Sequence, residues 1–186
     1  KTIRLGLIGT GLMGREIASA VARWCHLEDT GVRPVITALC GRTLPPARVA
    51  WFREHFPSLL LVTADHRELA ASTDVDAVYC AVPHHLHASI YTDVLRAGKH
   101  LLGEKPFGID QAANAAILGA IAAQPGVLVR CSSEFPFFPA AQRILALGES
   151  GAFGRILEVN TGFLHSSDLD PAKPINWKRT RAANGD

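Results

Sequence analysis

Apolar runs alternate with stretches of helical periodicity through the first two-thirds of the chain. Five apolar runs read as buried strands, at residues 3–8, 35–40, 59–62, 76–82 and 99–103. Between them, apolar residues recur every three or four positions, as in Met13, Ile17, Val21 and Trp24, which predicts amphipathic helices. This alternation of strand and helix predicts an α/β fold with a doubly wound parallel sheet.

Local signals mark the helix ends. Pro45 and Pro46 are suited to a first helical turn, and Gly98 is expected to end the helix that precedes it. Asp110 is expected to cap a helix that runs through Gln124, with apolar residues 117, 118 and 121 on one face.

Pro125-Gly126 is a break in composition, and we take it as a domain boundary. Residues 1–125 then form the domain with the parallel sheet, and residues 126–186 begin an α+β domain. In the second part we expect a strand at 128–132, a helix at 139–147 and a strand at 155–164. Apolar and polar residues mostly alternate along the last strand, which indicates a mostly antiparallel sheet with one solvent-exposed face. About 60 residues form only a marginal core, so this domain is expected to be incomplete.

Composition narrows the class of protein. The chain has 186 residues, of which 48% are hydrophobic and 19% charged, and its net charge is +2 without a basic block. No nucleic-acid partner is therefore expected, and no apolar run approaches the roughly 20 residues of a membrane span. No secretory signal segment is recognised at the start. The cysteines lack a paired spacing, which favours reduced thiols in a cytoplasmic protein: Cys25, Cys40, Cys80 and Cys131.

The first strand is followed at once by Gly9-Thr-Gly11-Leu-Met-Gly14, which then opens a helix. In this context Gly9 permits a tight turn, Gly11 lets a pyrophosphate approach, and Gly14 lets helix and strand pack closely. The helix start offers free N–H groups to phosphate. The sequence therefore predicts that residues 1–125 are a dinucleotide-binding Rossmann domain; the alternative is a flexible turn. The predicted coenzyme site comprises Gly9, Thr10, Gly11, Leu12, Met13 and Gly14.

The end of the second strand bears on which coenzyme binds. Many NAD sites place a carboxylate there for the ribose 2′-hydroxyl, but this chain has Gly41, Arg42 and Thr43. A guanidinium can pair with a 2′-phosphate through two hydrogen bonds. We therefore predict NADP, with NAD as the alternative coenzyme; Arg42 as an ordinary loop residue is the competing interpretation.

Two further groups follow later strands. Glu104-Lys105-Pro106 lies at the carboxyl end of the fifth strand, where ligands bind in open α/β sheets; a surface ion pair is the alternative. A partly desolvated Lys105 would exchange a proton with a carbinol or stabilise an alkoxide. His84, His85 and His87 have a spacing that a helix cannot gather around one metal, so no metal site is expected.

These motifs together resemble the glucose–fructose oxidoreductase/inositol dehydrogenase (Gfo/Idh/MocA) family over about residues 2–165. The resemblance rests on GLIGTGLMG and on DVDAVYCAVPHHLHASIYTDVLRAGKHLLGEKP. It implies that Glu104 contacts the nicotinamide ribose and that Lys105 is catalytic, at the reacting oxygen of the substrate. It also implies coenzyme contacts from the loop after the fourth strand: Ala81, Pro83, His84 and His87.

The chain departs from the family pattern in three places. His84 stands where asparagine is usual, and SEFPFFP at residues 133–139 replaces an arginine-rich stretch, which disfavours an acidic substrate. Those aromatics either line a less polar pocket or pack in a core. The family's Asp-x-x-x-His pair is not found, and Asp186 is expected to fall just before it, so the active site encoded here is expected to be incomplete.

By this resemblance the protein is expected to be an NAD(P)-dependent dehydrogenase or reductase. Hydride would pass between nicotinamide and a hydroxyl or carbonyl carbon of a sugar, cyclitol or related small molecule. A carbohydrate-like substrate and a homo-oligomer are the implied partners. The alternatives are an NAD-dependent glycosidase that uses transient oxidation and a non-catalytic NADP-binding sensor.

Overall fold

The computed structural model describes residues 1–28, 30–166 and 169–185. It divides into two compact units, the first formed by residues 1–132 and 177–185 and the second by residues 133–176. Each unit is described separately.

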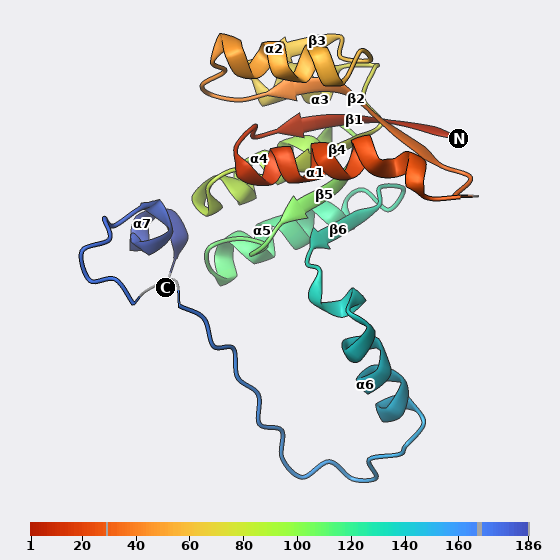
Figure 1. Ribbon diagram of the computed structural model, residues 1–186, viewed down its shortest axis with the longest axis vertical. Coiled ribbons are helices and arrows are strands. Elements are labelled where there is room, and N and C mark those ends of the chain that lie inside the picture. The colour runs from red at the N-terminus through yellow and green to blue at the C-terminus, as the bar shows by residue number, and fades with distance from the viewer. Residues whose placement is uncertain (29, 167–168, 186) are drawn as a thin grey trace. The chain divides into compact units, whose positions relative to one another are not determined.

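The first unit is built on a six-stranded sheet in the order β3-β2-β1-β4-β5-β6 (Figure 1). All neighbouring strands are parallel, which confirms the predicted doubly wound α/β fold. The chain reverses direction across the sheet between β1 and β4, and ligands bind at such switch points beyond the carboxyl ends of the strands. The strands are β1 Thr2–Ile8, β2 Arg33–Cys40, β3 Leu61–Thr63, β4 Ala77–Cys80, β5 His100–Glu104 and β6 Val129–Ser132.

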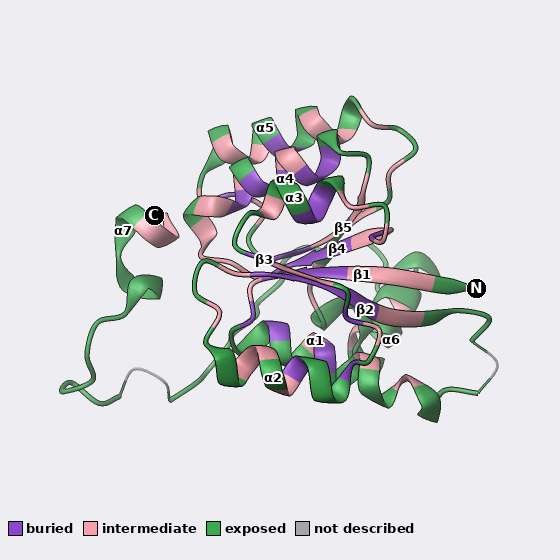
Figure 2. Cartoon of the chain, turned by 90° about the horizontal axis from the view of Figure 1, so that it is seen from above, coloured by how far each residue is buried: buried purple, intermediate pink, exposed green. Residues whose placement is uncertain are grey.

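Helices cover both faces of the sheet. Figure 2 shows α1 and α2 on one face and α3, α4 and α5 on the other. The α-helices of this part are α1 Leu12–Ala22, α2 Pro46–His55, α3 His66–Ala71, α4 His87–Arg96 and α5 Gln111–Ala122, and the short 3₁₀ helices are η1 Arg23–His26 and η2 His84–Leu86.

The predicted helix starts and the end at Gly98 are confirmed, but α5 ends at Ala122 and not at Gln124. Pro46 is the first residue of α2, and Gly98 follows α4 with a φ of 72°. The Asp110 side chain accepts a hydrogen bond from the Ala113 N–H at 2.7 Å and caps α5. On α5, Ile117 is fully buried, but Leu118 is 54% exposed and lies off the packed face.

The core has two parts, one on each face of the sheet. Val78 and Cys80 pack toward α4, whereas Tyr79 between them packs toward α1 and α2. Successive strand residues point to opposite faces, so both faces of β4 are buried, as its continuous apolar run predicts. Cys40 is likewise buried in β2, and burial raises the pKa of its thiol to about 11.

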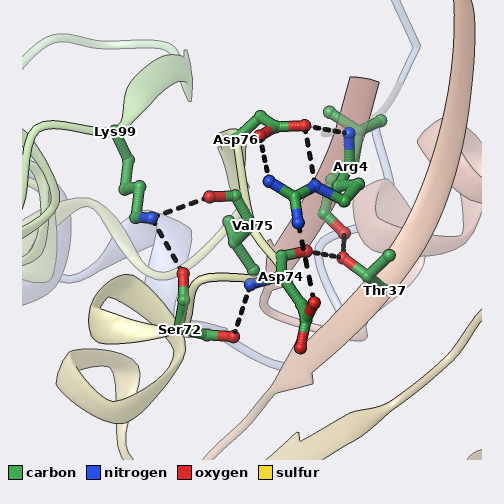
Figure 3. A network of polar contacts seen from close by, with 8 residues as sticks. Arg4, Thr37, Ser72, Asp74, Val75, Asp76 and Lys99 are labelled. Atoms are coloured by element: carbon green, nitrogen blue, oxygen red, sulfur yellow. Dashed lines mark hydrogen bonds and ion pairs between the residues drawn. The ribbon is translucent and has the colours of Figure 1, made fainter. Parts of the chain in front are cut away.

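Polar side chains close the amino ends of the central strands (Figure 3). The Arg4 guanidinium lies 2.6 Å and 3.1 Å from the two carboxylate oxygens of Asp76. Lys99 Nζ donates to the carbonyl oxygens of Ser72 and Val75 at 2.8 Å and 2.7 Å. The Arg4 hydrogen bonds lower the pKa of Asp76 to about 2.

The strand expected at residues 128–132 forms as β6, but it belongs to the first sheet. It pairs in parallel with β5, so that Gly103 lies opposite Cys131 and Glu104 opposite Ser132. The expected boundary after residue 125 therefore does not coincide with the end of this sheet.

The second unit contains η3 Phe135–Phe137 and α6 Pro139–Glu149, which runs one residue past Gly148. The strand expected at residues 155–164 is not formed, so that prediction is wrong for the described structure. A strand requires a hydrogen-bonded neighbour, and none of the described residues pairs with this segment. Its alternating apolar side chains stay exposed, as with Leu157 at 82% and Phe163 at 74%.

Two short helices, η4 Trp177–Arg179 and α7 Arg181–Asn184, return to the first unit, where α7 contacts η2. This segment therefore lies beside the loop that follows β4. Among the described residues, no helix combines the length and apolar character needed to cross a membrane.

Candidate functional site

Of the three glycines in the turn after β1, Gly9 and Gly14 tolerate no side chain, whereas Gly11 does. Gly9 has a φ of 96°, and a Cβ there would collide with the carbonyl group of Ala81 at the end of β4. A Cβ on Gly14 would collide with the carbonyl oxygen of Gly9. A Cβ on Gly11 would have no atom within 4 Å, so this side of the turn is open. The glycine spacing thus gives a tight turn with one accessible face.

A cavity of about 300 Å³ adjoins this open face. It is lined by residues 11–13 from the glycine turn, 81–84 after β4, 104–105 at the end of β5, and 177–178 from η4. Within the described residues α1 begins without a side-chain cap, so its first N–H groups are left to other partners. The structure therefore brings together Gly11, Ala81, Pro83, His84, Glu104 and Lys105 as lining residues.

Glu104 is held by two tyrosines. Its Oε1 accepts a hydrogen bond of 2.7 Å from the Tyr79 hydroxyl, and its carbonyl oxygen accepts one of 2.8 Å from the Tyr91 hydroxyl. The residue is only 7% exposed. Burial, and then the hydrogen bond to Glu104, raise the pKa of Tyr79, which keeps the phenol a donor. Glu104 is a fixed acceptor group and not the surface ion pair that was the alternative.

Lys105 is exposed at the cavity, next to this buried carboxylate. The expected partial desolvation of Lys105 is therefore not found. The side chain leaves the end of β5, and the described protein groups leave it accessible to water. A bound ligand would have to cover it.

His87 lies behind the cavity wall and is fully buried. Its Nδ1 is 2.7 Å from the Pro106 carbonyl oxygen, and its Nε2 is 3.0 Å from that of Val82. Its ring also stacks on Tyr91, with ring centres 4.8 Å apart. His87 thus joins the loop after β4 to the loop after β5 and, in this structure, is not one of the lining residues.

His84 lines the cavity from η2. Its ring meets the Trp177 ring edge-on at 5.0 Å, and the buried Nδ1 has no hydrogen-bond partner among the described residues. Burial, with the charges of nearby groups led by His87, lowers the pKa of His84. At neutral pH it is therefore an uncharged wall of the cavity.

The residues after β2 lie at the same edge of the sheet. The Gly9 N–H donates to the Cys40 carbonyl oxygen at 2.8 Å, so the glycine turn and the end of β2 are adjacent. Arg42 and Thr43 are exposed there, outside the 300 Å³ cavity. Thr10, between the two strand ends, is buried.

The sequence analysis did not predict five residues of the site: Tyr79, Val82, Tyr91, Trp177 and Lys178. A tyrosine inside an otherwise aliphatic strand was a signal for Tyr79, because a buried phenol needs a polar partner. No local signal placed Trp177 and Lys178 at the cavity, because they come from the far end of the chain.

The residues present fit a dinucleotide. The turn is open only at Gly11, where a diphosphate would approach main-chain N–H groups, and a buried acceptor, Glu104, lies across the cavity. An arginine and a threonine stand at the end of β2, where the adenosine ribose of such a ligand is held.

The chain is similar to a known protein family and to several characterised proteins. The model of the Gfo/Idh/MocA oxidoreductase family, with an NAD-binding Rossmann fold, matches residues 3–133. Levoglucosan dehydrogenase of Pseudarthrobacter phenanthrenivorans is 27% identical over the whole chain, which covers 47% of that protein. A solved structure of levoglucosan dehydrogenase with NADH and levoglucosan matches with a TM-score of 0.88 at 26% identity, covering 100% of this chain and 49% of the other.

Two further relatives differ in chemistry. Scyllo-inositol dehydrogenase of Lactobacillus casei, solved with NAD(H) and scyllo-inositol, matches at 25% identity with a TM-score of 0.70, over 83% of this chain and 43% of the other. Glycosyl hydrolase family 109 protein 1 of Bacteroides thetaiotaomicron is 27% identical over 97% of this chain and 38% of its own length. The chain thus spans about half or less of the length of these relatives.

Proposed function

The chain belongs to the Gfo/Idh/MocA oxidoreductase family, and on that premise we propose that it is an NADP-dependent dehydrogenase or reductase of a carbohydrate-like substrate. The observation that carries the proposal is that one cavity is lined both by the glycine turn and by Glu104 and Lys105. Relatives that bind levoglucosan or scyllo-inositol support a sugar or cyclitol as the substrate class.

Each group in the cavity has a task that its position supports. The N–H groups at the start of α1 bind the diphosphate through Gly11, Leu12 and Met13. Glu104 accepts a ribose hydroxyl hydrogen bond, because Tyr79 fixes its carboxylate without using all its acceptor positions. When bound, the nicotinamide gives or takes the hydride.

Lys105 then transfers the proton to or from the reacting oxygen of the substrate. Its Nζ takes the hydroxyl proton when the substrate is oxidised and returns it in the reverse direction. In the charged form it stabilises negative charge on that oxygen. The substrate covers the exposed side chain, which supplies the desolvation that the protein alone does not provide.

The function is tested by absorbance at the nicotinamide band. The protein is mixed with NADP and then with levoglucosan, scyllo-inositol or L-sorbose. Turnover of one of these polyols with formation of NADPH is the expected result. Absence of coenzyme binding in a calorimetric titration would overturn the proposal.

The coenzyme preference has its own measurement. Arg42 is expected to bind the 2′-phosphate through its guanidinium, with Thr43 adding a hydroxyl donor. NADPH should therefore bind more tightly than NADH. Tighter binding of NADH would reject the preference for NADP and leave an NAD-dependent enzyme.

A second candidate function is favoured by the similarity to glycosyl hydrolase family 109 protein 1. Such an enzyme would oxidise a glycoside transiently, with the coenzyme regenerated in each turnover. Release of sugar from a glycoside with no net change in NADPH absorbance would select this function over net oxidation.

A further inference from the structure

A second hollow in the first unit lies between α1 and α2 and is not used by the proposed chemistry. Its volume is about 620 Å³. Figure 2 shows the two helices together on one face of the sheet. Both helices follow parallel strands, so their first turns lie at the carboxyl edge of the sheet, and each carries an arginine that lines the hollow: Arg15 on α1 and Arg48 on α2.

These arginines are not explained by helix stability. The helix dipole favours acidic residues in the first turn and disfavours cations there. The first turns of α1 and α2 both lack an acidic residue. The ionisable residues that line the hollow are Arg15, Arg48 and His55, so no carboxylate contributes. Within the described part of the chain, neither arginine forms an ion pair.

Pro45 lines the same hollow and is three residues after Arg42. The exposed turn between β2 and α2 therefore brings a third guanidinium to this edge. Guanidinium groups without carboxylate partners are suited to a compact dianion such as a phosphate, which accepts their paired hydrogen bonds.

We propose that Arg15 and Arg48 act with Arg42 as a three-arginine site for the 2′-phosphate of NADP. This inference rests on the proposed function, which places the adenosine ribose at the end of β2. A phosphate there accepts forked hydrogen bonds from the guanidinium groups and offsets the unfavourable placement of two cations at helix starts. The ribose 2′-hydroxyl of NADH carries no such charge. Arg15 and Arg48 therefore add to the preference for NADPH over NADH that Arg42 provides.

The test uses calorimetric titration with adenosine 2′,5′-bisphosphate, 5′-AMP, NADPH and NADH. Arg15→Gln and Arg48→Gln should each weaken binding of the bisphosphate and of NADPH about tenfold, as expected for loss of a charged hydrogen-bond partner. Binding of 5′-AMP and NADH should change less than about twofold. Arg53→Gln is the matched control, because Arg53 is an exposed arginine of α2 that does not line the hollow.

The outcomes distinguish failure of the proposed function from failure of the three-arginine site. If the wild-type protein binds neither NADPH nor NADH, the proposed function fails and this inference fails with it. If both coenzymes bind and the ratio of NADPH to NADH affinity is the same in Arg15→Gln, Arg48→Gln and wild type, only the three-arginine site is overturned. A ratio that falls in both variants but not in Arg53→Gln supports it.

Discussion

Polar side chains at the two ends of the parallel sheet differ in whether they have partners within the protein. At the amino end, Arg4 is paired with Asp76, and the Lys99 ammonium donates to two carbonyl oxygens. At the carboxyl end, Gly11 faces open space, and Arg42 and Lys105 are exposed. At the amino end the charged side chains have partners within the protein, whereas at the carboxyl end Arg42 and Lys105 stay exposed.

The difference also appears in what holds each end together. Side-chain ion pairs close the amino end, while at the carboxyl end the loops are fixed from behind by His87, Tyr79 and Tyr91. The loops that carry the cavity residues are thus fixed, while Gly11 and Lys105 remain accessible at the cavity. We infer that stability and binding are placed at opposite ends of the strands.

The largest difference between the two ends is expected for their lysines, Lys105 and Lys99. Lys105→Ala should lower turnover about a thousandfold, as expected for loss of a proton-transfer group, with coenzyme affinity within about twofold of wild type. Lys99→Ala should keep the turnover of the folded protein and lower the free energy of unfolding by about 1–2 kcal/mol. Steady-state kinetics and urea unfolding of both variants give the readout. Unchanged turnover in Lys105→Ala would remove Lys105 from the mechanism.

The buried support of the carboxyl end is tested at His87. His87→Gln should lower the free energy of unfolding by about 2 kcal/mol, because a buried ring that contacts two carbonyl oxygens is replaced. Turnover should fall as well, since the loop that carries Lys105 is tied to this ring. The exposed neighbour His85→Gln serves as the control. Equal unfolding curves for the two variants would contradict the positioning role.

The smallest effect is expected at the amino end, with Asp76→Asn. The pKa of Asp76 is lowered to about 2, so its ion pair with Arg4 contributes above pH 4 and is lost as the pH falls toward 2. The substitution should cost about 1 kcal/mol at pH 7, reduced by solvent screening, and almost nothing near pH 2. Urea unfolding at both pH values measures this, and a cost independent of pH would refute it.

Much of the fold could be predicted because its signals are local. The glycine spacing at residues 9–14 and the cap at Asp110 depend on neighbours a few residues away. The strand predicted at residues 155–164 is not formed. Alternation of apolar and polar residues predicts one buried and one exposed face, but it does not show which strand would pair with the segment.

The site was predictable to the extent that it lies at strand ends. Glu104 and Lys105 follow from the position of β5, but the burial of one and the exposure of the other depend on Tyr79 and Tyr91, which are distant in sequence. Trp177 reaches the cavity only because the far end of the chain returns to the first unit. Such contacts are set by tertiary packing, which spacing does not encode.

Gly11→Ala tests whether the open glycine turn binds a coenzyme diphosphate. The new methyl group meets no protein atom within 4 Å, so the free energy of unfolding should change by no more than about 1 kcal/mol. Gly14→Ala, which collides with the Gly9 carbonyl oxygen, should instead cost about 1–3 kcal/mol. Calorimetric titration of Gly11→Ala with NADPH should show binding at least about tenfold weaker than in wild type. Unchanged NADPH affinity in a fully folded Gly11→Ala protein would show that the glycine turn does not bind the diphosphate.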